Sequence, residues 1–334
     1  MVVWSVGAGA IGGTVAARLV RAGVDPLVLD TNAEHVARLR APGLRVDGLD
    51  GGVVTPLRAA APGDALRAEP CDVVLLSVRS QSTAAALRPL VPRLGAASDV
   101  VSLQNGLNEE RIAALVGSAR TIGCVVGFGA TWIGPGHVEL TSPGELVLGR
   151  LDGSHDDRLA AVEALLARAF PTRITDNITG ALWAKMLINS VTVLGAVGGL
   201  LLGDVIAWNP RVLAHLLAEG VDVATAEQVQ LEDVFGLVPA ALVATRTPGW
   251  DDMLVRALEA VGRNFGRIKS VTWRDLELGR PTEIESVTGE IVRRARSRAI
   301  PAPLNTAAYA MLREIEAGQR PISRENLLLL ERMS

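Results

Sequence analysis

A short β-branched run leads directly into closely spaced glycines in the stretch Val2-Val3-Trp4-Ser5-Val6-Gly7-Ala8-Gly9-Ala10-Ile11-Gly12. The residues that follow, Ala10–Ala22, place apolar side chains at helical spacing. The pattern G-x-G-x-x-G therefore stands between a predicted strand and a predicted helix, which is the context that dinucleotide binding requires. This stretch predicts a nucleotide-binding βαβ fold, against the alternative of an ordinary glycine turn.

Each residue of the pattern has a physical role in such a loop. Gly7 permits the tight turn, Gly9 lets the backbone approach a pyrophosphate, and Gly12 allows the helix to pack closely on the strand. The backbone N–H groups at the helix N-terminus, which include those of Ala10 and Ile11, would face the phosphates. We therefore expect these five residues to bind the cofactor.

The first half of the chain alternates strand-like and helix-like segments. Apolar runs of the kind found in a doubly covered parallel sheet are Val2–Val6, Pro26–Asp30, Asp72–Ser77 and Asp99–Leu103. Val53–Leu57 and Ala119–Gly129 are expected to add strands, and Gly136–Gly149 is expected to form a hairpin. This alternation predicts an α/β fold with a Rossmann-type, doubly wound parallel sheet over residues 1–155.

From about residue 156 the pattern changes to long helical stretches with few strand signals. The expected helices are Asp157–Ala169, Gly180–Val193, Val212–Gln230, Trp250–Gly266, Glu283–Arg298 and Asn305–Ala317. A length of 334 residues also suits two domains better than one. We therefore expect an all-helical C-terminal domain over residues 156–334, which would hold the substrate and any dimer interface.

Composition argues against several classes of protein. The net charge of −3 and the pI of about 5.9 lack the basic surplus of a nucleic-acid or membrane-surface binder. The two cysteines cannot form a disulfide framework, so a reducing cytoplasm is the expected location, and the four histidines lack the spacing of metal ligands. The apolar stretch Met186–Gly203 is expected to be a buried helix passing into a loop, because no basic cluster flanks it.

Asp30 ends the second predicted strand and is the residue that bears on the choice between NAD and NADP. A carboxylate there can accept hydrogen bonds from the ribose 2′-OH, and its charge would repel a 2′-phosphate. Arg79 keeps NADP open, because its guanidinium could bind a 2′-phosphate or simply pair with Asp30. NAD is therefore favoured, and an exposed strand-end carboxylate without function is the alternative.

Lysine is rare in this chain, since only Lys185 and Lys269 are lysine among the 33 basic residues. Lys185 precedes Asn189 by one helical turn in an apolar segment, so the two lie on one helix face and need partners or a ligand. Burial lowers the pKa of an amine, which would suit Lys185 to protonate the alkoxide formed when hydride reduces a ketone. Asn189 would orient the substrate. The alternative is a lysine that extends to solvent at a domain surface.

Two further polar residues stand where this type of fold binds ligands. Asn105 follows a predicted sheet strand, and ligands bind at the carboxyl ends of such strands. Glu283 follows Pro281-Thr282, which indicates a helix start, and would lie in the first helical turn. There it could hold a substrate hydroxyl or the Lys185 ammonium. An Asn-Gly turn and a structural first-turn acid are the respective alternatives.

Four motifs, taken in this order, resemble the ketopantoate reductase family. They are G-A-G-A-I-G-G at 7–13, S-L-Q-N-G-L at 102–107, L-W-A-K-M-L-I-N at 182–189 and G-R-P-T-E-I-E at 279–285. The resemblance spans essentially the whole chain. It implies a Rossmann domain followed by a helical domain, and NADPH-dependent reduction of 2-dehydropantoate to (R)-pantoate.

The resemblance also implies roles for single residues. Lys185 matches the general acid, and Glu283 matches the glutamate that binds the hydroxyl end of the substrate. Asn105 matches an asparagine that contacts cofactor and substrate, and Asn189 matches a substrate-binding asparagine. Arg79 replaces a lysine of the family, which keeps the charge and changes its shape.

Departures from the family pattern concern cofactor and substrate choice. Asp30 stands where the family has a basic residue for the 2′-phosphate, which puts NADP in doubt. Val271 replaces a serine that contacts the substrate carboxylate, and Trp273 is new, which implies an altered pocket for a different or bulkier 2-oxo acid. Ser270 or Lys269 is the candidate for the missing carboxylate contact.

The expected function is NAD(P)H-dependent reduction of a branched, ketopantoate-like 2-oxo acid to the (R)-2-hydroxy acid. One alternative is an NAD-dependent D-2-hydroxy-acid dehydrogenase with a bulkier substrate, and another is an NAD-binding sensor without catalysis. A sugar-nucleotide dehydrogenase would need a cysteine nucleophile, and neither Cys71 nor Cys124 stands beside a base. The expected partners are the small-molecule substrate and a second copy of the chain, bound through the apolar region after Lys185.

Overall fold

The chain divides into two compact units, Met1–Ile178 and Thr179–Ser334. The computed structural model describes residues 1–65, 70–232, 234, 248–265 and 269–333. The first unit extends beyond the boundary expected at residue 155 and includes α6 (Asp157–Leu166) and β12 (Thr172–Ile174). The physical reason is that β12 pairs with a strand of the N-terminal sheet, so the sheet continues past the expected boundary.

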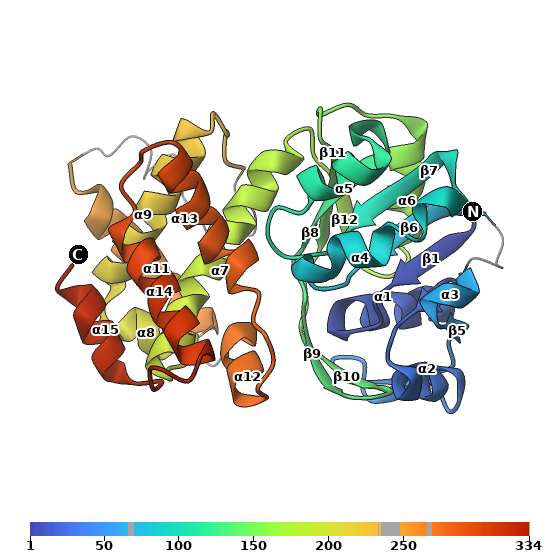
Figure 1. Cartoon of the computed structure of the whole chain (residues 1–334), viewed down its shortest axis with the longest axis horizontal. Helices are drawn as coiled ribbons and strands as arrows, with labels where there is room; N and C mark the ends of the chain where they lie inside the picture. Colours follow the sequence, from blue (N-terminus) through green and yellow to red (C-terminus); the bar gives the residue numbers. More distant parts are fainter. Residues whose placement is uncertain (66–69, 233, 235–247, 266–268, 334) are drawn as a thin grey trace. The chain divides into compact units, whose positions relative to one another are not determined.

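The first unit is built on an eight-stranded sheet with the order β12-β11-β8-β7-β6-β1-β2-β5 (Figure 1). Its remaining strands are β1 (Val3–Val6), β2 (Leu27–Leu29), β5 (Ala59–Ala60), β6 (Cys71–Leu76), β7 (Leu94–Ser102), β8 (Thr121–Val126) and β11 (Leu146–Arg150). All neighbours pair in parallel except β8 with β11. The run β5-β2-β1-β6-β7-β8 is the strand order of a Rossmann fold, which confirms the expected α/β class.

Helices cover both faces of this sheet. The helices of the unit are α1 (Ala10–Arg21), α2 (Ala33–Arg40), α3 (Pro62–Ala65), α4 (Thr83–Leu87), α5 (Glu109–Val116) and α6. One hydrophobic core joins Val3 of β1 to Val15 of α1 and Val162 of α6. A second core joins Trp4 of β1 to residues of α4 and α5, among them Ile112. Adjacent β1 residues thus face different cores, as period-two alternation requires in a doubly covered strand.

A separate four-stranded sheet, β4-β3-β10-β9, was not expected from the sequence. Its strands are β3 (Leu44–Gly48), β4 (Val53–Thr55), β9 (Gly129–Gly134) and β10 (His137–Ser142). The hairpin expected over Gly136–Gly149 was wrong, because β10 pairs with β9 and β3 whereas β11 joins the main sheet. The actual hairpin turns at Pro135-Gly136, and the chain between β10 and β11 passes from one sheet to the other.

The described part of the second unit contains helices and no strand. They are α7 (Ile178–Gly198), α8 (Leu202–Trp208), α9 (Pro210–Ala226), α11 (Trp250–Phe265), α12 (Val271–Glu277), α13 (Thr288–Ser297), α14 (Pro303–Glu316) and α15 (Arg324–Glu331). By length and composition α7 could cross a membrane, but 78% of its most apolar window is buried inside the structure. It ends at Gly198, and Gly199 has a φ of +67°, so this helix passes into a loop as expected.

Candidate active site

The glycine stretch forms the turn between β1 and α1, and its glycines are needed for different reasons. Gly7 has a φ of +91°, and a Cβ built on it would lie 2.9 Å from the Val78 backbone nitrogen. A Cβ on Gly12 would overlap the Gly7 carbonyl oxygen and the Ser77 hydroxyl. A Cβ on Gly9 would meet no atom within 4 Å. The turn is therefore tightly packed at its base and open at Gly9.

The N-terminus of α1 is suited to an anion. Gly9 occupies the N-cap position without a side-chain hydrogen bond, and the first turn, which includes Ala10 and Ile11, contains no acidic residue. The N–H groups of this turn and the positive end of the helix dipole are thus not neutralised by a carboxylate of that turn. Together with the open space at Gly9, this geometry fits a pyrophosphate.

Asp30 lies directly after β2 and contacts the glycine turn. Its Oδ2 accepts a hydrogen bond from the Ala8 backbone N–H at 2.8 Å, and its Oδ1 accepts one from the Asn32 N–H at 2.9 Å. Each oxygen retains a lone pair, so the carboxylate can still accept a hydrogen bond from a ribose hydroxyl. The structure therefore places Asp30 beside the turn, as a residue that selects the cofactor requires.

His35 is a residue of this region that sequence reasoning missed. It is fully buried in α2, where its Nδ1 accepts from the Gly136 N–H at 2.8 Å. The ring proton must then lie on Nε2, which donates to the Ala8 carbonyl oxygen at 2.8 Å. Ala8 is thus held at its N–H by Asp30 and at its carbonyl by His35. No local sequence motif indicates this role, because it depends on contact with Gly136, which is distant in the sequence.

Arg79 and Asn105 follow two neighbouring strands of the sheet. Arg79 comes after β6, and Asn105 comes after β7. Because β1, β6 and β7 are adjacent and parallel, their carboxyl ends meet at one edge of the sheet. The structure therefore brings the loops of both residues to the edge where the glycine turn lies, which is where open α/β sheets bind ligands.

Lys185 and Asn189 lie one turn apart on α7 in the second unit. Lys185 is half-buried, and its chain neighbours Ala184 and Met186 are fully buried. Burial lowers the pKa of the Lys185 ammonium from 10.5 to about 8, because the charged form loses hydration. An amine with this pKa can donate and regain a proton near neutral pH, as the sequence analysis expected of it.

Glu283 lies outside an α-helix, contrary to the expected helix over Glu283–Arg298. It is the N-cap of the single 3₁₀ turn Ile284–Ser286, and α13 begins only at Thr288. The preceding Thr282 is buried and donates its N–H to Glu316 Oε1, which explains why the chain turns here before the helix starts. The Thr282 hydroxyl donates a second hydrogen bond to the same Glu316 oxygen. The P-T-E motif is thus attached to the end of α14.

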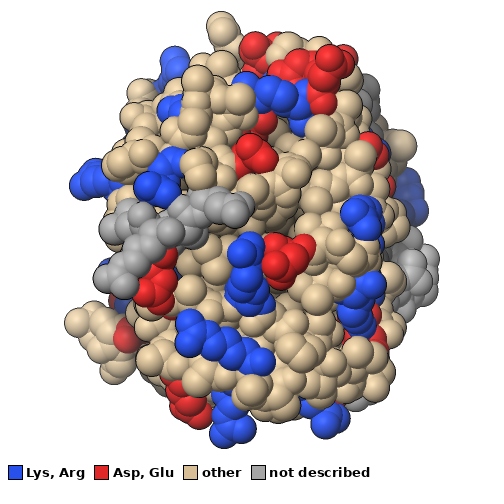
Figure 2. Space-filling model, turned by 90° about the vertical axis from the view of Figure 1, so that its right-hand side faces the viewer, with Lys and Arg blue, Asp and Glu red and all other residues tan. Residues whose placement is uncertain are grey.

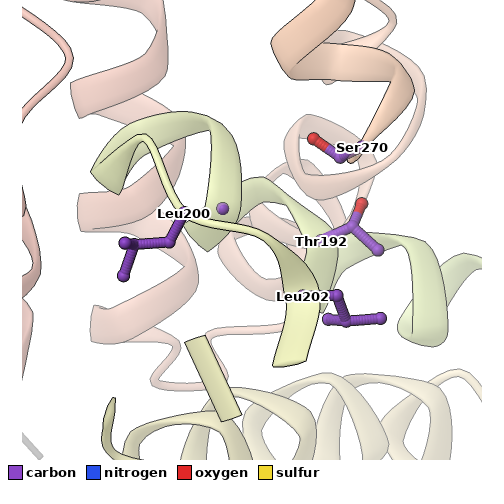
Figure 3. A pocket seen from close by; sticks show the side chains of 5 residues that line it. Thr192, Leu200, Leu202 and Ser270 are labelled. Atoms are coloured by element: carbon purple, nitrogen blue, oxygen red, sulfur yellow. The ribbon is translucent and has the colours of Figure 1, made fainter. Parts of the chain in front are cut away.

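Ser270 borders a small hollow in the second unit that Thr192, Gly195, Leu200 and Leu202 also line (Figure 3). Its hydroxyl oxygen caps α12 by accepting the Trp273 N–H at 3.1 Å. Lys269, the other candidate for the carboxylate contact, forms an ion pair with Glu277, and its ammonium lies 4.2 Å from the centre of the Trp273 ring. Of these two residues, Ser270 is the one that lines the hollow.

Val271 and the two cysteines differ in exposure. Val271 is 54% exposed, so it does not form a closed pocket wall in this unit. Cys71 and Cys124 are buried and free, and burial raises the pKa of the Cys71 thiol to about 12. A thiol that stays protonated is a poor nucleophile. The buried Cys71 thiol is therefore unsuited to nucleophilic attack.

The described part of the chain shows neither a cluster of metal ligands nor, on the face drawn in Figure 2, a continuous basic surface. No group of three or more His, Cys, Asp or Glu side chains there could hold a metal ion. The face of the molecule in Figure 2 carries acidic and basic side chains interspersed with each other. That face therefore does not present the continuous basic surface of a nucleic-acid binder.

Comparison with known proteins relates the chain to one family along most of its length. Residues 3–153 match the family described as Ketopantoate reductase PanE/ApbA, and residues 177–316 match its C-terminal domain. The chain is 31% identical to the 2-dehydropantoate 2-reductase of Halobacterium salinarum over 308 residues, which cover 89% of this chain and 93% of that protein.

Solved structures agree with this relationship. The PanE/ApbA family ketopantoate reductase from Ralstonia eutropha JMP134 is 30% identical with a TM-score of 0.80, over 96% of this chain and 99% of that chain. The complex of D-mandelate dehydrogenase with NADH and anilino(oxo)acetate has a TM-score of 0.82 at 20% identity, over 96% and 99% of the two chains, and shows a shared fold. The chain belongs to the ketopantoate reductase PanE/ApbA family.

Proposed function

We propose that this protein is an NAD(P)H-dependent oxidoreductase that reduces a branched 2-oxo acid, of which ketopantoate is the type, to the (R)-2-hydroxy acid. The observation that carries the proposal is Lys185, whose pKa burial lowers to about 8 on the first helix of the second unit. The Halobacterium relative is named for the reduction of 2-dehydropantoate, which supports the choice of substrate class.

The residues of the first unit fit a nicotinamide dinucleotide. Gly9 leaves open space where a pyrophosphate would approach, and Ala10 and Ile11 lie in the uncapped first turn of α1. Asp30 would accept a ribose hydroxyl, and Arg79 and Asn105 follow strands that end at the same edge of the sheet. When bound, the cofactor supplies a hydride to the substrate carbonyl carbon.

The residues of the second unit supply the proton and hold the substrate. As the C=O bond becomes a C–H and an O–H, the Lys185 ammonium gives its proton to the carbonyl oxygen and is left as a neutral amine. Asn189, one turn along α7, would orient the substrate, and Glu283 would bind a hydroxyl at its far end. Ser270 would meet the carboxylate in place of the hydroxyl absent at Val271.

The finer proposal is that NADH is preferred over NADPH. Asp30 contributes a full negative charge next to the turn that binds the adenosine half of the cofactor, and its oxygens already accept two backbone N–H groups. A 2′-phosphate at this place would face that carboxylate, whereas a 2′-OH can donate a hydrogen bond to it. This supports NAD as the cofactor.

The test is a steady-state comparison of NADH and NADPH with ketopantoate and with larger branched or aromatic 2-oxo acids. We expect NADH to give the higher kcat/KM with ketopantoate, and Lys185→Arg to remove turnover because arginine does not release a proton. A higher kcat/KM with aromatic 2-oxo acids would identify the chain as a D-2-hydroxy-acid dehydrogenase. NADH binding without turnover of any acid would identify a sensor.

Two assembly and location proposals accompany this function. We propose a homodimer, supported by a solved neighbour from Staphylococcus aureus that is described as dimeric. The apolar region after Lys185 packs within its own unit, since a Cβ on Gly198 would overlap Leu327, so a dimer would use another surface. Light scattering of the purified chain tests this.

The two free cysteines support a reducing, cytoplasmic location.

A further inference from the structure

The loops that contain Arg79 and Asn105 are joined by a buried network of hydrogen bonds. The Ser80 hydroxyl donates to the Asn105 carbonyl oxygen at 2.9 Å, and the Asn108 amide donates to the same oxygen at 2.8 Å. The Asn108 amide also donates to the Ser80 hydroxyl oxygen at 3.1 Å. Ser80 and Asn108 are 2% and 1% exposed. Ser80, the residue after Arg79, is thereby bonded to the Asn105 carbonyl oxygen directly and also through the Asn108 amide.

Gln104 makes the matching connection on the other side of Arg79. Its amide donates to the Val78 carbonyl oxygen at 2.7 Å and to the Thr83 hydroxyl at 2.8 Å. The Thr83 hydroxyl in turn donates to the Ser80 carbonyl oxygen at 2.8 Å. The residues before and after Arg79 are therefore both fixed to the loop of Asn105 by buried side chains.

Asn108 makes these bonds at the expense of a more usual one. It occupies the N-cap position of α5, where an asparagine oxygen commonly accepts an N–H of the first helical turn. Here the side chain makes no capping bond, and its Oδ1 is buried without a hydrogen-bond partner among the described residues. The backbone of Asn108 is helical (φ −97°, ψ −12°) and not extended as at a capping asparagine, and its side chain bonds Ser80 and Asn105 instead. Local rules are most often broken in this way at functional sites.

We propose that Asn108, together with Ser80, is a positioning residue for the nicotinamide cofactor. The pair fixes the peptide of Asn105 against the loop of Arg79, so that both residues are in place before the cofactor binds. A loop held in its bound conformation adds no ordering cost to binding, and this raises affinity. The inference rests on the proposed function, because it assigns Arg79 and Asn105 to the cofactor.

The test measures NADH binding directly, from the fluorescence of the nucleotide, in the absence of substrate. Asn108→Asp keeps the shape and removes the amide donor, and Ser80→Ala removes the hydroxyl. We expect each variant to raise the Kd for NADH about tenfold, because each substitution breaks two hydrogen bonds of this network. Because the two residues act as one unit, the double variant should bind little more weakly than either single variant. With NADH varied at saturating 2-oxo acid, KM for NADH should rise while kcat changes little.

Asn326→Asp is the matched control. Asn326 is 3% exposed, and its amide also donates to two acceptors, the carbonyl oxygens of Val197 and Pro321, in the second unit. Its Oδ1 accepts a hydrogen bond from Arg320 at 2.9 Å, which the carboxylate retains, and the variant should keep the wild-type Kd for NADH. Unchanged NADH binding in folded Asn108→Asp or Ser80→Ala would overturn the positioning role and leave the proposed function intact. A wild-type chain that binds neither NADH nor NADPH would overturn both.

Discussion

Replacement of Lys185 by methionine should remove catalysis and at the same time stabilise the protein. Burial lowers the pKa of Lys185 from 10.5 to about 8, which corresponds to about 3 kcal/mol at about 1.4 kcal/mol per pH unit. Below pH 8 the folded protein holds a charged amine at this cost. Methionine has a similar length and no charge, so Lys185→Met should raise the free energy of unfolding at pH 7 by up to about 3 kcal/mol.

The sign of the pH dependence follows from the same values. Between pH 8 and 10.5 the unfolded chain binds more protons at Lys185 than the folded chain does, so wild-type stability should rise with pH over this range. The advantage of Lys185→Met should therefore be complete below pH 8 and disappear above pH 10.5. Urea unfolding of both proteins at pH 7 and at pH 10 measures this difference.

The kinetic part of the prediction uses the same pKa. If the Lys185 ammonium donates the proton, the rate of reduction at saturating NADH should be constant below pH 7 and fall about tenfold per pH unit above pH 8. Lys185→Arg is the control, because it keeps the charge and cannot donate a proton at these pH values. A rate that stays constant from pH 7 to pH 10 would refute the assignment. So would a Lys185→Met protein that is less stable than wild type at pH 7.

Three other predictions test the first unit. Burial raises the pKa of Glu109 from 4.5 to about 7. The free energy of unfolding should therefore fall as pH rises from about 4.5 to 7. In urea unfolding at pH 8, Glu109→Gln should be about 3 kcal/mol more stable than wild type. Equal slopes of stability against pH in both proteins would contradict this. Asp30→Asn should shift the ratio of kcat/KM for NADH to that for NADPH toward NADPH at least about fivefold, since about 1 kcal/mol of repulsion between the carboxylate and the 2′-phosphate is removed. An unchanged ratio would mean that Asp30 does not face the ribose. Gly12→Ala should lower stability by about 1–3 kcal/mol and weaken NADH binding, because its Cβ would overlap the Gly7 carbonyl oxygen. Calorimetry and NADH fluorescence check this, and wild-type values in both would show that α1 can move away from the turn.

The main sheet could be predicted because its signals are local. The glycine pattern marks one strand–helix junction, and apolar runs such as Asp72–Ser77 are typical of strands that are covered on both faces. The four-stranded sheet could not be predicted in the same way. Its β3 pairs in parallel with β10, which lies about 90 residues further along the chain. A strand was expected over Val53–Leu57, where β4 lies, but its sequence does not show that it pairs with β3 in a second sheet.

Residues of the candidate site also differ in whether a local sequence signal indicates them. Lys185 and Asp30 could be proposed because one is an ionisable side chain in an apolar segment and the other ends a predicted strand, and Glu283 because it follows Pro281-Thr282. Ser80 and Asn108 were not singled out from the sequence, and their burial depends on which strands become neighbours. Helical spacing also failed at Glu283, where the bond from Thr282 to Glu316 delays the start of α13.

Cofactor choice and loop geometry are inseparable at Asp30. The carboxylate that would meet the ribose also accepts the Ala8 N–H, and the Ala8 carbonyl is held by a His35 ring that Gly136 keeps in one tautomer. Asp30→Arg, the obvious change to accommodate a 2′-phosphate, would therefore leave the Ala8 N–H without its acceptor. Conversion to NADPH should then require a second acceptor for Ala8, and a single substitution should lose affinity for both cofactors.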